Sequence, residues 1–105
     1  MRRIALDART WHSTDDLYSA LLLALGAPGW HGRNLDALWD SLTEGAAGRP
    51  DPDAPRPINR VQPPFHVVVS HADAAPEAVR NLLARIGGLF AEARAEHAID
   101  VTLTF

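Results

Sequence analysis

The chain has 105 residues and 47% of them are hydrophobic, which suits one domain with a buried core. It has no cysteine, so disulfides and thiolate metal sites are excluded. The net charge of −3 is unevenly spread, because residues 1–12 are basic and the acidic excess lies mainly in residues 13–45. Acidic surfaces repel phosphates, so we expect a basic partner and no direct nucleic-acid binding. No apolar run suits a signal peptide or a membrane span, so we expect a cytoplasmic protein.

The chain begins with a predicted strand followed by a predicted helix. Residues 3–6 alternate between polar and apolar, which is typical of a short strand. Residues 13–26 predict a helix, because Ser13 or Thr14 can cap its first N–H groups and Gly26 can end it. The apolar stripe expected to face the core consists of Leu17, Leu21, Ala24 and Leu25.

A second predicted helix lies in the stretch "GWHGRNLDALWDSLTE", with Asn34 as its cap and residues 35 to about 44 as its body. One arc of this helix is apolar and holds Leu35, Leu38, Trp39 and Leu42, and the next arc holds Asp36, Asp40, Thr43 and Glu44. Acids four residues apart repel each other at a cost of about 0.2–0.5 kcal/mol per pair. A helix that aligns charges against its own stability is typical of a binding surface.

The second half of the chain predicts a loop, a strand, a helix and a strand. Residues 44–64 are rich in proline and have no apolar period, which predicts a loop. The unbroken apolar run within residues 64–71 predicts a strand covered on both faces. Residues 75–97 predict a helix that Gly87-Gly88 should kink or split; its inward positions are Val79, Leu82, Leu83, Ile86, Phe90 and Ala93. The alternation in residues 99–105 predicts a last strand that buries Ile99, Val101, Leu103 and Phe105.

The order of these elements predicts the fold class. Strands separated by helices are most simply parallel, with right-handed crossovers. We therefore expect one α/β domain over residues 1–105, with a small three-stranded parallel sheet packed with three to four helices.

The polar residues do not predict an enzyme. Asp36 and Asp40 share one exposed helix face and enclose no pocket, so we do not expect acid–base catalysis from them. The five histidines have no metal-ligand spacing, and no phosphate or dinucleotide glycine pattern is present, so we expect no metal and no cofactor. Trp39 at the edge of the apolar arc is explained by the core alone, whereas Trp30, in a glycine-bracketed turn beside acids, is typical of an interface hot spot.

The run from Gly32 to Thr43, "GRNLDALWDSLT", resembles the central motif of the barstar family, the intracellular ribonuclease inhibitors, almost position for position. In addition, "DLYSALLLALGAP" is similar to the first helix of that family, and "FAEARAEHAIDVTLTF" to its last helix and last strand. The resemblance covers nearly the whole chain apart from the proline-rich segment. It implies a three-stranded parallel sheet packed with helices, and binding rather than catalysis.

The resemblance also implies which residues bind the partner. Barstar-like inhibitors plug a ribonuclease active site with the second helix and the preceding loop, and their acids stand in for substrate phosphates. By this resemblance Asp40 is the central phosphate-mimicking aspartate, Asp36 supports it from one turn earlier, and Glu92 is an accessory acid. The full expected set is Trp30, His31, Gly32, Asn34, Asp36, Trp39, Asp40, Thr43, Glu44 and Glu92.

The implied partner is the basic active-site cleft of a ribonuclease or related nuclease toxin, which would make the chain an antitoxin or immunity protein that is monomeric when free. A non-inhibitory binding module for another basic cellular partner stays open as an alternative. The chain departs from the family pattern at His31 and Arg33, which bring positive charge beside the acids, and at Glu44 and Gly45. These departures affect the expected choice of partner more than the fold.

Overall fold

The computed structural model describes residues 2–29, 31–43 and 59–105. Its main elements, in chain order, are β1 (Arg2–Asp7), α1 (Thr14–Ala24), α2 (Leu35–Thr43), β2 (Phe65–Ser70), α3 (Glu77–His97) and β3 (Val101–Thr104). Two single 3-10 turns follow the first two strands, η1 (Ala8–Thr10) and η2 (Ala72–Ala74). The predicted α/β class is confirmed, with three α-helices in the described part of the chain.

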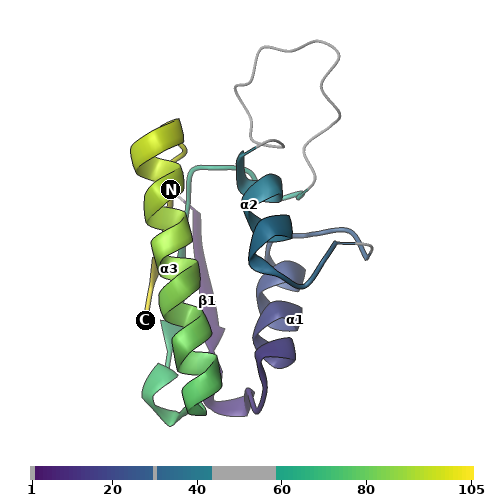
Figure 1. Ribbon diagram of the computed structural model, residues 1–105, viewed down its shortest axis with the longest axis vertical. Helices are drawn as coiled ribbons and strands as arrows, with labels where there is room; N and C mark the ends of the chain where they lie inside the picture. Colours follow the sequence, from purple (N-terminus) through teal and green to yellow (C-terminus); the bar gives the residue numbers. More distant parts are fainter. Residues whose placement is uncertain (1, 30, 44–58) are drawn as a thin grey trace.

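The three strands form one parallel sheet in the order β1-β2-β3, so β2 is central. The register aligns Ile4, Val67 and Leu103 in one row, and these side chains belong to the core or pack against it. Figure 1 shows α3 passing in front of the strands, with α1 and α2 beside it. The helices therefore cover one face of the sheet.

The opposite face of the sheet is open in the described structure. Its central row contains Arg3, His66 and Thr102, and the next row includes Val68, which is only half-buried. The expectation that β2 is covered on both faces is therefore wrong. The prediction treated the whole apolar run as buried, but Val68 lies on the open side, where no described helix packs.

The core lies between the sheet and the helices. Leu17 and Leu21 of α1, and Leu25 directly after it, are each at most 1% exposed. The inward residues of α3 are equally buried, and they are Val79, Leu83, Ile86, Phe90 and Ala93. Phe65 of β2 meets Phe90 edge to face, with ring centroids 6.2 Å apart. The predicted stripes are thus confirmed, except that Ala24 and Leu82 are only partly buried.

The ends of α1 follow the predicted capping chemistry. The Ser13 hydroxyl accepts a hydrogen bond from the Asp16 N–H, and the Asp16 carboxylate accepts from the Ser13 and His12 N–H groups. These backbone hydrogen bonds, the one from His12 first, hold the pKa of Asp16 below its ordinary value. Gly26 ends the helix with a φ of 67°, a conformation that other residues rarely adopt.

The residues after the undescribed segment pack against this same helix end. The Arg60 N–H donates to the Gly26 carbonyl and the Val61 N–H to the Leu25 carbonyl. A Cβ on Gly26 would lie 2.7 Å from the Cβ of Arg60, so only glycine permits this approach. Of the predicted 44–64 loop, residues 44–58 lie outside the described residues, and Asn59 and Val61 are buried.

The helix α3 runs unbroken from Glu77 to His97, so the predicted split at Gly87-Gly88 is wrong. The apolar residues on both sides of the pair are anchored in the core, and this packing outweighs the weak helix propensity of glycine. A Cβ on Gly87 would lie 3.6 Å from the Phe105 ring and 3.8 Å from the Leu103 side chain. A small residue there brings α3 close to the last strand.

The end of β3 differs from its prediction. Val101 is fully buried and Leu103 partly so, in agreement with the alternating pattern. Phe105 was expected on the buried side, but it is 58% exposed. The strand ends at Thr104, so Phe105 no longer follows the alternation, and its ring lies near α3 at Gly87.

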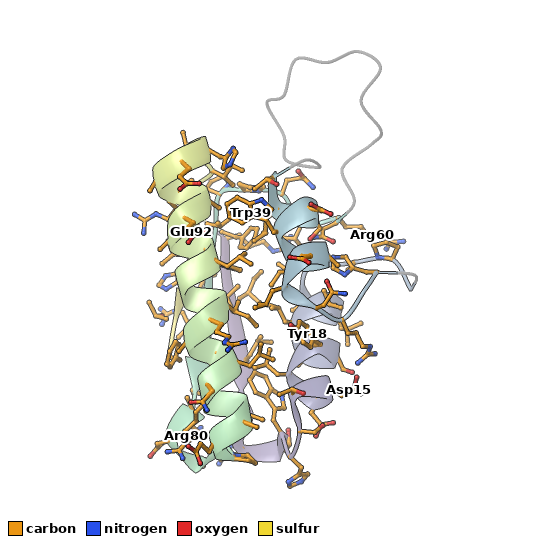
Figure 2. The ribbon with its side chains drawn as sticks, in the orientation of Figure 1. Asp15, Tyr18, Trp39, Arg60, Arg80 and Glu92 are labelled. Atoms are coloured by element: carbon orange, nitrogen blue, oxygen red, sulfur yellow. The ribbon has the colours of Figure 1, made fainter. Side chains whose placement is uncertain are left out.

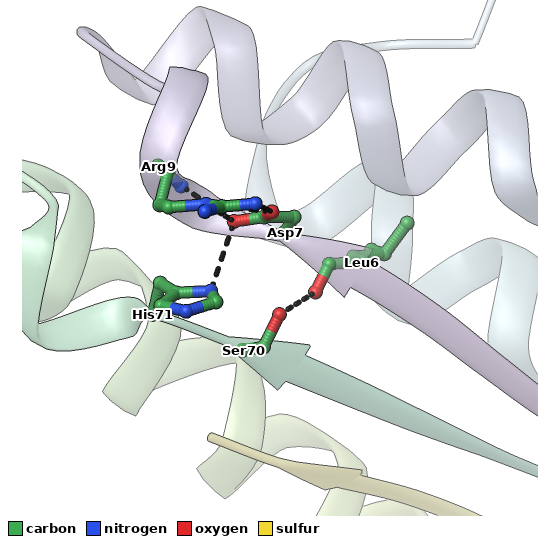
Figure 3. Close-up of polar contacts among 5 residues, drawn as sticks. All are labelled: Leu6, Asp7, Arg9, Ser70 and His71. Atoms are coloured by element: carbon green, nitrogen blue, oxygen red, sulfur yellow. Dashed lines mark hydrogen bonds and ion pairs between the residues drawn. The ribbon is translucent and has the colours of Figure 1, made fainter.

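A polar cluster ties the carboxyl ends of β1 and β2 together (Figure 3). The Arg9 guanidinium donates to the Asp7 carboxylate at 2.7 Å, and His71 Nδ1 lies 3.2 Å from the same carboxylate. The Ser70 hydroxyl donates to the Leu6 carbonyl. The side-chain hydrogen bond from Arg9 is the main cause that lowers the pKa of Asp7 to about 2.

This pKa predicts an acid-dependent loss of stability. The pKa of Asp7 is lower in the folded state, so its ionised form stabilises the fold at neutral pH and the contribution is lost as pH falls from about 4 through about 2. Asp7→Asn should therefore be less stable than the parent at pH 6, and the difference should shrink between pH 4 and pH 2. Urea unfolding at a series of pH values measures it. Asp73→Asn is the control, and an Asp7→Asn difference that stays constant with pH would contradict the prediction.

A second prediction concerns the two glycines of α3. A Cβ on Gly88 would have no heavy atom within 4 Å, and one on Gly87 would make only ordinary contacts. Replacing glycine by alanine inside a helix stabilises by about 0.5–1 kcal/mol. We therefore expect Gly87→Ala and Gly88→Ala each to raise the free energy of unfolding by about that amount. A loss of stability in Gly88→Ala, measured by urea unfolding, would show that this helix position is strained.

Candidate functional site

The second helix begins where its cap was predicted. The Asn34 side-chain oxygen accepts from the Ala37 N–H at 2.7 Å, and the Asn34 carbonyl accepts from the Leu38 N–H. Leu38 and Leu42 are buried at 0% and 3% exposure, which fixes the rotation of the helix about its axis. Asp36 and Asp40 consequently face solvent.

The exposed acids have no partners in the described structure. Asp36 and Asp40 on α2, and Glu92 on α3, form no ion pair or hydrogen bond with any other described residue. Elsewhere in that part of the chain, Asp7 and Asp15 are paired with arginines. Several other exposed acids of the described chain are also unpaired, so what distinguishes these three is their place on α2 and on the side of α3 beside it, where their charges are available to a cationic ligand.

A groove separates α2 from α3 and brings two of these acids together. Its volume is about 380 Å³, and it is lined by Leu35, Asp36, Trp39, Arg85, Gly88, Leu89 and Glu92. Figure 2 shows Trp39 and Glu92 close together where the two helices adjoin. Gly88 contributes no side chain, so it leaves this part of the groove open. Asp40 does not line the groove but lies on the adjoining exposed face of α2.

Trp39 serves both the core and the surface. It is half-buried and packs against the hydrophobic core, while its indole also lines the groove. His97, in the last turn of α3, meets it edge to face, with ring centroids 5.3 Å apart and an interplanar angle of 72°. The indole is therefore held from two sides before any partner arrives.

Other residues of the expected set support this surface from within. His31 is 8% exposed, and its Nδ1 donates to the Gly32 carbonyl at 2.7 Å, while its buried Nε2 has no hydrogen-bond partner among the described residues. A Cβ on Gly32 would lie 3.0 Å from the Cβ of Ala37, so glycine lets the chain turn tightly into α2. Trp30 and Glu44 lie outside the described residues.

Two expectations about this surface need correction. Thr43 was placed on the acidic arc, but it is 3% exposed and its hydroxyl donates to the Trp39 carbonyl. Arg33 was expected to bring positive charge beside the acids. Its guanidinium instead donates to the Asp15 carboxylate at 2.8 Å and to the Ser19 hydroxyl, so it is directed to α1. His31 is buried as well, so neither side chain is exposed beside the acids as expected.

The sequence analysis missed Arg85, Gly88, Leu89 and His97. The first three share one face of α3 with Glu92, at spacings of three, four and seven residues. Once Glu92 was expected to bind the partner, helical spacing could have predicted that these three residues lie on the same face. The contact of His97 with Trp39 joins residues 58 positions apart, and no local pattern predicts it.

No group of three or more histidine or acidic side chains among the described residues could hold a metal ion. In the same part of the chain, no helix has the length and apolar character needed to cross a bilayer.

The fold and site define a small α/β domain with a parallel sheet. It presents unpaired acids beside a groove between α2 and α3. The chain matches the family model described as "Barstar (barnase inhibitor)" over residues 1–105, and it belongs to the barstar family. It is also 46% identical over 43 residues to the protein named "Putative ribonuclease inhibitor YrdF" of Bacillus subtilis (strain 168). That match covers 41% of this chain and 47% of the relative, so it spans about half of the relative's length.

The Trp39–His97 contact leads to a third prediction. His97→Ala removes an edge-to-face pair that is worth about 0.5–1.5 kcal/mol beyond its buried area. We expect a loss of stability of that size and a shift of the Trp39 indole N–H signal in NMR spectra, assigned with a Trp39→Phe variant. Glu96→Ala, an exposed neighbour, is the control. An unchanged indole signal in His97→Ala would show that the histidine does not hold the ring.

Proposed function

We propose that this protein inhibits a ribonuclease by covering its active-site cleft with α2, the loop before it and the adjoining face of α3. The carrying observation is that Asp36 and Glu92 line a groove together with Trp39, that Asp40 lies on the adjoining exposed face of α2, and that none of the three acids has a partner among the described residues. Membership of the barstar family supports the same function. In the complex the carboxylates occupy the places of RNA phosphates.

The spacing of the acids favours binding to a cationic cleft. Asp36 and Asp40 repel each other in the free helix at a cost of about 0.2–0.5 kcal/mol. A cleft lined with basic residues relieves this repulsion and adds attraction, which also steers the encounter. Binding then gains from a charge arrangement that the isolated helix disfavours.

The packing of Trp39 favours the same proposal. A large aromatic side chain that is already held by the core and by His97 loses little conformational freedom when a partner covers it. Half-buried tryptophans beside charged residues are frequent hot spots of protein interfaces. Trp39 therefore serves as the apolar anchor next to the acids.

The proposed activity is stoichiometric binding without turnover, by one domain acting as a monomer. A ribonuclease inhibitor of this kind protects the cell that contains the nuclease, so we place it in the cytoplasm as an antitoxin or immunity protein. The alternative partner is another basic protein that is not a nuclease, and the following experiment separates the two.

The fourth prediction tests the role of Asp40 with barnase, the ribonuclease named by the family, as the probe. Asp40 is exposed and unpaired among the described residues, so Asp40→Ala should change the free energy of unfolding by only a few tenths of a kcal/mol. The same change should raise the inhibition constant at least about 30-fold, which corresponds to a hot spot of about 2 kcal/mol. The known range of hot-spot energies already includes the value for an aspartate of barstar. The expected effect of about 30-fold is therefore taken from the family and is not an independent estimate.

The matched control is Asp73→Ala, which removes an equal charge from η2 after β2. It should leave the inhibition constant nearly unchanged, whereas Asp40→Ala should also weaken the salt dependence of association. Equal inhibition by both variants would exclude the acidic face as the inhibitory surface. If the parent chain does not inhibit barnase, the alternative of a different basic partner gains support.

A further inference from the structure

One residue of the groove carries the opposite charge. Arg85 lines it together with Asp36 and Glu92, and its exposed side chain forms no ion pair or hydrogen bond with any other described residue. Arg85 and Glu92 are seven residues apart, about 10.5 Å along the helix axis, with Gly88 between them. The face of α3 that borders the groove therefore has a cation at one end and an anion at the other.

On its other side, Arg85 has no acidic neighbour to pair with. Arg85 also lines a second hollow of about 410 Å³ along α3, whose other lining residues are Thr14, Ala78, Asn81, Leu82 and Ala84. None of these is acidic. Arg85 thus stands on the ridge between a neutral hollow and the acidic groove, where it meets whatever covers the groove.

An arginine at this position changes which partners fit. A cleft with basic residues all around its rim would place a cation against Arg85, and like charges facing each other across an interface disfavour binding strongly. A carboxylate on the rim would instead receive the planar guanidinium in a two-pronged hydrogen bond. The groove therefore fits a rim on which an acidic side chain lies next to the basic ones.

We propose that Arg85 determines selectivity among ribonucleases by pairing with a rim carboxylate of the partner and rejecting a partner with a cation there. This inference rests on the proposed function. It adds that the partner carries a carboxylate at the rim of its active site, which the acids of the inhibitor alone do not specify.

The test uses the full chain and a panel of barnase variants in which each exposed residue around the active site is changed in turn to Glu and to Lys. The parent chain should inhibit the Glu form better than the Lys form at one or more rim positions, by about tenfold, which is typical of a direct charge pair. Arg85→Glu should invert that preference at the same positions. Arg85→Gln should abolish it without inverting it, and Arg80→Glu, on the same helix outside the groove, should leave it intact.

The outcomes separate this inference from the proposed function. If no rim position shows a charge preference that depends on residue 85, while Asp40→Ala still weakens inhibition, the selectivity role is wrong and the inhibitor function stands. If Asp40→Ala inhibits every barnase variant as well as the parent does, and no charge preference depends on residue 85, the acidic face and the groove are not the inhibitory surface and both proposals fail. If Arg85→Glu inverts the preference for Glu over Lys at one patch of the rim only, the result supports the role of Arg85 and locates the rim position that it contacts.

Discussion

The burial of one side of α2 determines which residues of this helix form the exposed acidic face. A nine-residue helix is too short to be stable alone, so its stability comes from packing. Leu38 and Leu42 enter the common core, and the tight turn at Gly32 and the cap at Asn34 fix where the helix starts. Once these contacts exist, Asp36 and Asp40 must face outward.

The same packing creates the groove. The residues of α3 that face the core, from Val79 to Ala93, set its distance from α2, and Gly88 leaves the space between the helices open. Glu92 then lies across from Asp36 and Trp39, far away in sequence but close in space. The unpaired charges are a small cost to the free protein, which the buried core outweighs and a cationic partner would recover.

Local signals in the sequence predicted the elements and their ends well. The strand β1, the cap of α1 at Ser13, the left-handed Gly26 and the Asn34 cap of α2 each depend on a few neighbouring residues, and all were confirmed. The parallel sheet followed from the alternation of strands and helices. The placement of Asp36 and Asp40 on an exposed face followed from helical periodicity.

The wrong predictions concern features that depend on contacts between residues far apart in the sequence. Core packing keeps α3 continuous through Gly87-Gly88, and only the tertiary structure shows that Val68 faces an uncovered side of the sheet. Arg33 turns to Asp15, a partner 18 positions away, instead of joining the acidic face. The groove itself joins two helices whose relative placement no local pattern specifies, so Arg85 and His97 became visible only in the structure.

The proposed function requires that the acidic face of α2 and the groove beside it form the partner-binding surface. The most direct measurement is an NMR titration of the isotopically labelled chain with catalytically inactive barnase, followed at each backbone amide. The account predicts that the largest signal changes lie in α2, the turn before it and the groove face of α3 around Glu92. Changes concentrated on the open face of the sheet, around Arg3, His66 and Thr102, with α2 unaffected, would contradict it.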